Sequence, residues 1–365
     1  MSLPKASPSI TTAFRVWEMN FRHRKIGVRG NPTRSKPTAK PQRRDAQSKT
    51  STFSLSVNLS RRAAADTHCS GSARSASPAI LATTTLKNPS LANFVWITGA
   101  SGLIGNYLVQ TARPPALRIR ALTRAELNLE DFAAVREAFR KDSPQLVIHC
   151  AALANTPACE KNPPLAHKLN VDVTRVLAEL AADIPFVFFS TDLVFDGRAG
   201  NYDESAAVSP LSVYGKTKAD AERVVLANPK HTVLRTSLNF GQSPTGDRAF
   251  NEQMRRTVER GETLQLFTDE FRCPIPAVEN ARAVWELVAQ NKPGLYHVVG
   301  DERLSRWEIG QLLAKHWGLN PKMEPGSIRD FRGLPRSPDT SLNCAKVQKL
   351  LSFPLPRFSE WLAGN

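Results

Sequence analysis

The sequence predicts an α/β fold: a doubly wound parallel sheet, followed by a smaller C-terminal domain and preceded by a disordered N-terminal leader. Short apolar runs alternate with helical patterns from Phe94 onward. The first of these runs leads directly into three glycines that are spaced three residues apart. The run 184–190 is apolar almost throughout, as is typical of a parallel strand that is covered on both faces.

Residues 1–90 form a basic leader that we expect to be disordered. Of the formal net charge of +16, residues 1–92 carry +13, from 16 Lys and Arg against 3 Asp and Glu. A segment rich in Ser, Arg and Pro, without a sustained apolar period, buries too little apolar surface to offset the entropy of ordering it. Three explanations stay open: an organellar transit peptide, a basic tail that binds an anionic partner, and upstream sequence from a misplaced start.

The rest of the chain is close to neutral, with 33 basic against 30 acidic residues, which argues against nucleic-acid binding as the main function. The cysteines are odd in number and scattered, without the pair spacing of a zinc site, so we expect reduced thiols and no metal: Cys69, Cys150, Cys159, Cys273 and Cys344. No apolar run approaches the roughly 20 residues that span a membrane. We expect a cytoplasmic protein, or an organellar one if the leader is a transit peptide; a homodimer is left open.

The stretch 94–111 reads as strand, glycine turn and helix, which is the start of a dinucleotide-binding Rossmann unit. Gly99 allows a tight turn after the strand, Gly102 allows backbone N–H groups to approach a pyrophosphate, and Gly105 allows the helix to pack closely on the sheet. The phosphates then lie at the positive end of the helix. We therefore expect the cofactor to bind at Gly99, Ser101, Gly102, Leu103, Ile104 and Gly105.

The alternation of strands and helices continues to about residue 300. Strands are expected at 117–122, 145–151, 184–190, 231–236 and 294–299, and helices at 129–140 and about 164–182. Beyond Gly300, Ser305 and Glu308 form a capping box that opens a helix ending near Gly318. We expect a dinucleotide-binding domain at 91–240, and a mainly substrate-binding domain at 241–365 that returns one or two strands to the sheet.

Tyr214 and Lys218 are spaced four residues apart in a predicted helix, 211–222, and so share one face. A free phenol has a pKa of about 10. A fixed ammonium group one turn away favours the phenolate, so we expect the pKa of Tyr214 to fall toward the working range. The same lysine can hold the ribose hydroxyls of a nicotinamide cofactor.

Thr191 and Asp192 follow the apolar run 184–190 directly. Ligands of open α/β sheets bind at the carboxyl ends of the strands, so both side chains are expected at the binding edge. A hydroxyl there can polarise a substrate carbonyl next to the tyrosine.

The choice of dinucleotide depends on the end of the second strand. An NAD-binding unit usually has an Asp or Glu there, but no acidic residue lies between Gly105 and Ala125. Thr123 can donate a hydrogen bond to a 2′-phosphate, and Arg124 can pair with it. We therefore expect NADPH, with NADH as the alternative.

Together these motifs resemble the extended short-chain dehydrogenase/reductases and, within them, the dTDP-4-dehydrorhamnose reductases. The matching segments cover roughly three quarters of the chain and are 98–105, 149–152, 159–163, 169–171, 190–197, 209–218, 234–237 and 336–343. The sequence departs from the family pattern at Asn128, where an aspartate is usual, at Leu193, where a tyrosine is usual, and at Leu238, where an aromatic residue is common.

The resemblance implies a role for each matched residue. Tyr214 would be the proton donor, Lys218 its electrostatic partner, and Thr191 the hydroxyl that polarises the carbonyl. Asp192 and Leu238 would contact substrate. The remaining residues would bind the cofactor, along its length at Ala151, Ala152 and Leu153 and near the adenine at Asn128 and Leu129.

The function that this implies is the NADPH-dependent reduction of the 4-keto group of a nucleotide-linked deoxysugar, as in dTDP-rhamnose biosynthesis. One alternative is an epimerase or dehydratase of the same superfamily, which the adjacent Thr191 and Asp192 also fit. The other is a non-catalytic, NADP-binding regulatory subunit of methionine adenosyltransferase.

Overall fold

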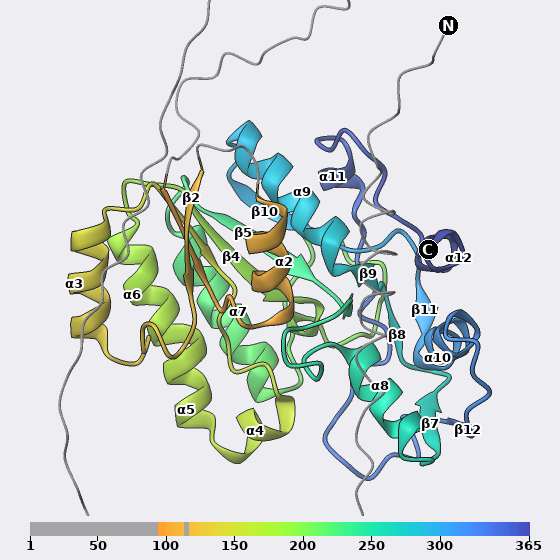
Figure 1. Ribbon diagram of the computed structural model, residues 1–365. Helices are drawn as coiled ribbons and strands as arrows, with labels where there is room; N and C mark the ends of the chain where they lie inside the picture. Colours follow the sequence, from red (N-terminus) through yellow and green to blue (C-terminus); the bar gives the residue numbers. More distant parts are fainter. Residues whose placement is uncertain (1–93, 113–116) are drawn as a thin grey trace, which may run out of the picture. The chain divides into compact units, whose positions relative to one another are not determined.

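The computed structural model describes residues 94–112 and 117–365, so the expected leader lies outside the described residues. Six parallel strands form the central sheet, in the order β10-β5-β4-β3-β1-β2 (Figure 1). The predicted doubly wound parallel sheet is confirmed. Its strands are β1 (Phe94–Thr98), β2 (Arg118–Leu122), β3 (Leu146–His149), β4 (Phe186–Thr191), β5 (Thr232–Thr236) and β10 (Gly294–His297).

β1 lies between β2 and β3, so the chain reverses the direction in which it adds strands at this point of the sheet. In the register of the sheet, Thr98 pairs with Leu122 on one side and with His149 on the other. A ligand crevice is expected outside the carboxyl ends of the strands where the order reverses. The switch point therefore brings the glycine turn and the end of β3 to one edge.

Both faces of the sheet are buried, which explains why its inner strands read as apolar almost throughout. Val95 and Ile97 point into one core cluster, whereas Trp96 between them points into another. The first cluster packs against α2 (Leu103–Thr111) and α9 (Ala277–Gln290). The second packs against helices on the opposite face (Figure 1): α3 (Phe132–Asp142), α6 (Val173–Leu180) and α7 (Val213–Leu226).

The single helix expected at about 164–182 is interrupted by a wider turn. The segment consists of α5 (Pro163–His167), the π-helical turn η1 (Lys168–Asp172) and α6, and it is preceded by α4 (Thr156–Lys161). The buried Asn170 side chain in this turn binds both the N–H of Leu153, at 2.8 Å, and the hydroxyl of Thr217, at 3.0 Å. A π-turn re-aims one side chain within a helix, often at a functional site, and here it ties the loop after β3 to α7.

The C-terminal part of the chain builds a third core cluster, around Phe240, Leu266, Ile309 and Phe358. The predicted capping box is confirmed: the Ser305 hydroxyl accepts a hydrogen bond from the Glu308 N–H, and the Glu308 carboxylate accepts one from the Ser305 N–H. The sequence patterns did not indicate the short elements that surround it. These parts are η2 (Asp192–Val194), β6 (Asn239–Phe240), α8 (Phe250–Glu259), β7 (Leu264–Phe267), β8 (Phe271–Arg272), β9 (Ile275–Pro276), β11 (Leu304–Ser305), β12 (Met323–Gly326), α11 (Ala345–Gln348) and α12 (Phe358–Gly364). The capping box opens α10 (Arg306–His316), which is the helix expected to end near Gly318.

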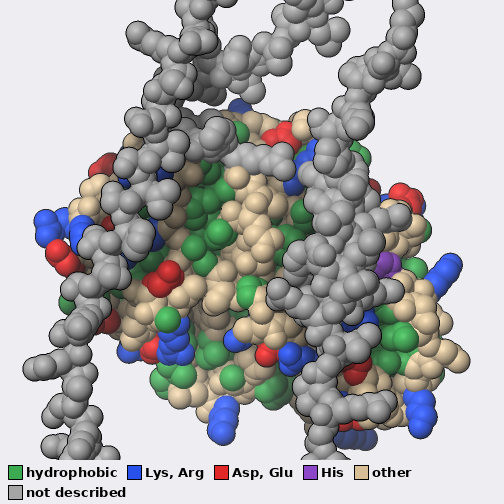
Figure 2. All heavy atoms as spheres, in the orientation of Figure 1, with side chains coloured by type: hydrophobic (Ala, Val, Ile, Leu, Met, Phe, Trp, Pro, Cys, Tyr) green, Lys and Arg blue, Asp and Glu red, His purple; other side chains and the backbone are tan. Residues whose placement is uncertain are grey.

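The face shown in Figure 2 carries basic and acidic side chains side by side among the apolar ones. Within residues 94–112 and 117–365, no helix has both the length and the apolarity needed to cross a bilayer. Across that same part of the chain, no three His, Cys, Asp or Glu side chains are grouped so that they could hold a metal ion.

Candidate active site

A cleft of about 760 Å³ runs along the carboxyl ends of β1, β3, β4 and β5 and is called the main cleft below. The Rossmann part lines it with Gly99, Gly102, Leu103, Ile104, Gly105, Cys150, Ala152, Leu153, Ala154, Asn155, Thr156, Phe189, Ser190, Thr191, Asp192, Leu193, Tyr214, Lys218, Thr236 and Ser237. The later segments contribute Leu238, Asn239, Asp247, Arg248, Phe250, Gln253, Glu270, Arg272, Arg306 and Arg336. The cleft thus joins the glycine turn to all of the predicted catalytic and substrate residues.

The backbone around the glycine turn is packed so closely that side chains at Gly99 and Gly105 would clash with it. Gly99 has a φ of +68°, which favours glycine, and a Cβ there would lie 2.7 Å from the N atom of Ala151. A Cβ on Gly105 would lie 2.4 Å from the carbonyl oxygen of Gly99, so only a glycine allows α2 to approach the turn this closely. The first N–H groups of a helix lack partners within it and attract phosphate.

One further feature of the cleft suits a bound ligand. The buried hydroxyl of Ser190, on the wall of the cleft, has no hydrogen-bond partner within the described part of the chain. Such orphaned groups are rare in native structures unless a ligand or water satisfies them. The turn, the helix terminus and this hydroxyl are what a bound nicotinamide dinucleotide would need.

The side chains of Tyr214 and Thr191 are neighbours in the main cleft, where the Thr191 hydroxyl lies close enough to act on the pKa of the phenol. Thr191 is the last residue of β4, and Tyr214 lies in the first turn of α7. That turn is fixed from two sides: the Ser212 hydroxyl accepts from the N–H of Gly215, at 3.1 Å, and the Glu160 carboxylate accepts from the N–H of Val213, at 2.7 Å. These hydrogen bonds fix the backbone of the helical turn that carries Tyr214.

The expected fall in the pKa of Tyr214 is wrong for the structure as it stands. Burial is the largest cause and raises the pKa of Tyr214 above its usual range, and the nearby carboxylate of Asp192 adds to the rise. The nearby hydroxyl of Thr191 opposes the rise only in part. Tyr214 is thus a protonated phenol at neutral pH, which is the form that can donate a proton.

The environment of Lys218 disfavours the charged form of its ammonium group. Lys218 is only 3% exposed, and its Nζ lies 3.9 Å from the ring centroid of Phe188. Burial lowers its pKa to about 7, while the carboxylate of Glu222, one turn further along α7, favours the charged form. Glu222 in turn binds the guanidinium of Arg235 through both oxygens, at 3.0 and 2.8 Å.

This burial gives Lys218 a measurable effect on the pH dependence of stability. Its pKa is lower in the folded chain, about 7, than the ordinary 10.5, so the unfolded chain binds more protons between these values. Below pH 7, burying the charged ammonium group lowers the free energy of unfolding by its full amount. As the pH rises above 7 the buried group loses its proton, and this destabilisation decreases. We expect Lys218→Met to be more stable than wild type at pH 7, with the difference shrinking by pH 9. Thermal unfolding of both proteins at the two pH values checks this; a difference that grows with pH would contradict it.

The carboxylate of Asp192 connects the Rossmann part to the later segments. Its Oδ2 accepts hydrogen bonds from the hydroxyls of Ser237, at 2.6 Å, and Thr340, at 2.9 Å, and lies 3.5 Å from the guanidinium of Arg272. Its Oδ1 accepts from the hydroxyl of Thr191, at 3.2 Å. Asp192 lines the main cleft as predicted, yet it also fixes four other groups around the reacting end.

Six of the predicted cofactor-binding residues do not line the main cleft: Ser101, Thr123, Arg124, Asn128, Leu129 and Ala151. Four of them, Thr123, Arg124, Asn128 and Leu129, were predicted to bind the adenosine end of the cofactor. At the end of β2, the carboxylate of Glu126 folds back and accepts from the N–H of Thr123, at 2.8 Å. Arg124 is 78% exposed at its side chain and pairs with Glu130, at 2.7 Å. Their cofactor roles stay predictions.

Four arginines and one glutamate in the main cleft were missed by the sequence reasoning: Arg248, Arg272, Arg306, Arg336 and Glu270. Glu270 is 2% exposed and bonds to Arg336 and Arg272. They come from segments up to 88 positions apart in the chain. Only the fold brings these five residues together. The one indication in the sequence was that residues 336–343 resemble the substrate-domain segment of the family.

Comparisons with known proteins agree with this architecture. The RmlD substrate binding domain family matches residues 93–364. The methionine adenosyltransferase 2 subunit beta of Xenopus laevis is 30% identical over 70% of this chain and 81% of its own length. A dTDP-4-dehydrorhamnose reductase of Sinorhizobium fredii is 29% identical over 72% of this chain and 93% of its own. The crystal structure of a dTDP-4-dehydrorhamnose reductase from Bacillus anthracis in complex with NADP superposes with a TM-score of 0.70 at 24% identity, covering 74% of this chain and 97% of that one.

Proposed function

The chain belongs to the RmlD substrate-binding family of NAD(P)-dependent oxidoreductases with the extended short-chain dehydrogenase/reductase fold, and we propose that it reduces the 4-keto group of a nucleotide-linked deoxysugar with NADPH. The observation that carries the proposal is that Thr191 and Tyr214 lie next to each other in the same cleft as the glycine turn.

The side chains of this pair suit the reduction of a ketone. A bound nicotinamide supplies the hydride to the carbonyl carbon. Tyr214, protonated at neutral pH, gives its hydroxyl proton to the carbonyl oxygen, and the Thr191 hydroxyl donates a hydrogen bond to the same oxygen. Lys218, in its charged form, then favours the phenolate that remains. The remainder of the cleft, including Leu238, holds the sugar.

NADPH binding is proposed to run from the glycine turn, past Ala152 and Leu153, to the end of β2. Arg124 is the group that would pair with the 2′-phosphate there, although it already pairs with Glu130, and the Nζ of Lys168 lies 3.8 Å from the same carboxylate. The division into a dinucleotide-binding part, 91–240, and a mainly substrate-binding part, 241–365, is part of this proposal.

Replacement of Arg124 by alanine is expected to weaken NADPH binding about tenfold and to leave NADH binding unchanged, because a charge-assisted hydrogen bond to phosphate is lost. Glu130→Gln should have the opposite effect, since it frees Arg124 from a competing carboxylate. Calorimetric titration of both cofactors into the three proteins measures this. Equal loss of the two cofactors in the alanine variant would contradict the assignment.

The function is tested by following NADPH consumption with dTDP- and UDP-linked 4-keto-6-deoxysugars. Turnover with at least one of them is the expected result. An epimerase or dehydratase would change the sugar without net consumption of cofactor. Because the carboxylate of Asp192 is taken up by Ser237, Thr340 and Arg272, it is poorly placed to act as the base of such an enzyme.

A second candidate function is that of a non-catalytic NADP-binding subunit of methionine adenosyltransferase. It is favoured by the 30% identity to such a beta subunit, which is as high as the identity to the reductases. It predicts that NADPH binds without turnover on any sugar of the panel, and that the chain forms a complex with a methionine adenosyltransferase catalytic subunit in size-exclusion chromatography.

A further inference from the structure

A series of buried polar side chains begins at Lys218 and continues behind the main cleft. Glu222 lies one turn further along α7, Arg235 lies on β5, and His297 lies on β10. Arg235 and His297 are direct partners in the register of the sheet, so their side chains lie on the same face. All three residues are at most 3% exposed, and none of them lines the main cleft. Their arrangement therefore serves something other than direct contact with a ligand.

The carboxylate of Glu222 is held in place by the guanidinium of Arg235. The Nε and Nη2 atoms of Arg235 donate to the two carboxylate oxygens, at 3.0 and 2.8 Å. The Nη1 atom lies 3.3 Å from Nε2 of His297, and burial lowers the pKa of His297 to about 3, so this imidazole is neutral and can accept. The ring centroid of Phe195 lies 5.0 Å from Cζ of the same guanidinium. The carboxylate is thus fixed by groups from β5 and β10.

Lys218 has no carboxylate at ion-pair distance within residues 94–112 and 117–365, and its Nζ lies over the ring of Phe188 on β4. The titratable groups that face it from β3 and the loop after β3 are His149 and Cys150. Burial lowers the pKa of His149 to about 3 and raises the pKa of Cys150 above its usual range, so both are neutral at neutral pH. Glu222, on the same helix, is therefore the charged group that favours the ammonium form.

Three other titratable groups face the Tyr214 end of α7: Asp192 on η2, and Cys159 and Glu160 on α4. The carboxylate of Asp192 already lies 3.5 Å from the guanidinium of Arg272. Burial raises the pKa of the Cys159 thiol, which is neutral at neutral pH. Asp192 and Cys159 act on the phenol of Tyr214, whereas Glu222 acts on the ammonium group of Lys218.

We propose, on the basis of the reductase function above, that Glu222 and Arg235 are positioning residues of the reaction, because the fixed carboxylate keeps the ammonium group of Lys218 charged. A charged Lys218 favours the phenolate that remains once Tyr214 has given up its proton. Burial works against that charge, and a carboxylate one turn away opposes the effect of burial. Since Arg235 takes up the carboxylate, Glu222 acts on Lys218 at a distance and leaves Nζ available to the ribose of the cofactor.

The test is the pKa of Lys218 itself, read by NMR from the lysine Cε signals of the full chain labelled with ¹³C-lysine. Lys218→Met, which lacks the signal, identifies it. Glu222→Gln should lower this pKa by about one pH unit, because the favourable charge is lost while the guanidinium stays. Arg235→Met should leave it at or above the wild-type value, because the carboxylate stays. The double variant should fall between the two.

A purely structural role of the pair predicts a different pattern. Loosened packing would let water reach Lys218 and raise its pKa in every variant. An unchanged or higher pKa in Glu222→Gln would therefore overturn the inference, and so would a lower pKa in Arg235→Met. Melting curves show which variants are folded, and each of the two single variants decides the question without the other.

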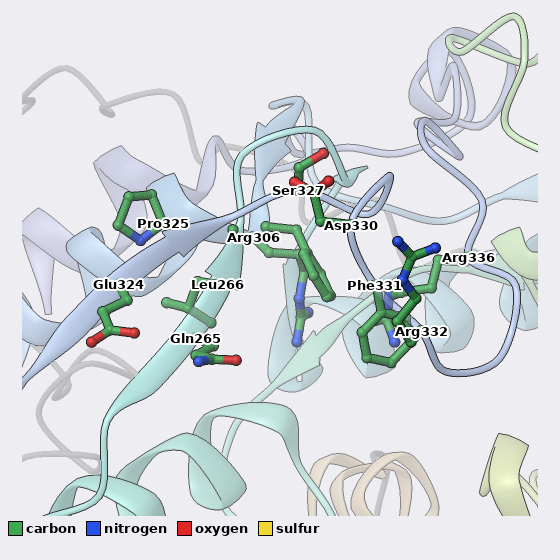
Figure 3. Close-up of a pocket in the computed structure, with 12 residues that line it drawn as sticks. Gln265, Leu266, Arg306, Glu324, Pro325, Ser327, Asp330, Phe331, Arg332 and Arg336 are labelled. Carbon is green, nitrogen blue, oxygen red and sulfur yellow. The ribbon is translucent and has the colours of Figure 1, made fainter.

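The pH profile of kcat connects this pKa to the reaction. With NADPH and a 4-keto-6-deoxysugar nucleotide, the pH above which kcat declines should move down in Glu222→Gln by as much as the pKa of Lys218 does. Glu324→Gln is the control for the loss of one negative charge and should move neither. Glu324 is exposed on β12 and lines a second hollow, of about 550 Å³ (Figure 3), but not the main cleft.

The two measurements separate this inference from the proposed function. A lowered pKa of Lys218 in Glu222→Gln with an unmoved kcat profile would overturn the inference and leave the reductase function standing. A lowered pKa in a chain that turns over no sugar nucleotide would overturn the proposed function and leave standing the effect of Glu222 on the charge of Lys218.

Discussion

Tyr214→Phe is expected to lower kcat by about 100-fold or more while NADPH binds as in wild type. The substitution removes only the hydroxyl, and with it the proton that the reduced oxygen must receive. The ring stays, so the packing of α7 and the hydrogen bonds at Ser212 and Glu160 should be unaffected. Steady-state kinetics, together with cofactor titration, separates loss of chemistry from loss of binding.

The control for this variant is Tyr202→Phe. The hydroxyl of this buried tyrosine donates to Asp196, at 2.9 Å, and Tyr202 does not line the main cleft. It should retain nearly all activity. Undiminished turnover in Tyr214→Phe would refute the role of the phenol. An equal loss in both variants would indicate damage to the fold instead.

Arg235→Met is expected to lower the free energy of unfolding by about 3–5 kcal/mol, because it leaves the carboxylate of Glu222 buried without its partner. Both side chains of the pair are only 4% exposed, and the second Nη of Arg235 also lies 3.3 Å from Nε2 of His297. Since Glu222 is one turn from Lys218, the loss should also disturb α7, the helix that carries Tyr214 and Lys218. Chemical denaturation measures the change.

The matched experiment is the double variant Glu222→Gln with Arg235→Met, which removes both charges. Burying an ion pair offers little net stability over neutral groups of similar volume. The double variant should therefore recover much of the stability that the single variant loses, which double-mutant-cycle analysis quantifies. A double variant no more stable than Arg235→Met would mean that the guanidinium acts through packing on Phe195, whose ring centroid lies 5.0 Å from Cζ, and not through charge.

The sequence was sufficient for those parts of the site that are local along the chain. The glycine turn follows from one strand and one helix start, and Tyr214 and Lys218 follow from a single helical spacing. Thr191 could be placed because it ends an apolar run, and the carboxyl ends of parallel strands meet at one edge. The approximate positions of the six sheet strands could be predicted for the same reason.

The parts that could not be predicted depend on burial or on distant segments. The direction of the pKa shift at Tyr214 is set by desolvation and by Asp192, neither of which a helical spacing reveals. The ion pairs of Glu270 join β8 to a loop near residue 336 and follow no periodic pattern. The π-turn at 168–172 arises from the tertiary hydrogen bonds of Asn170, against a helical pattern that continues through it.

We propose that a hydride and a proton are transferred in this cleft to the keto group of a nucleotide sugar. The most direct measurement is to supply NADPH carrying deuterium at C4 of the nicotinamide with dTDP-4-keto-6-deoxysugars and to examine the product by NMR and mass spectrometry. We expect deuterium at C4 of the sugar with wild type and almost none with Tyr214→Phe. A wild-type chain that binds NADPH but transfers no deuterium to any sugar of the dTDP and UDP panel would contradict it.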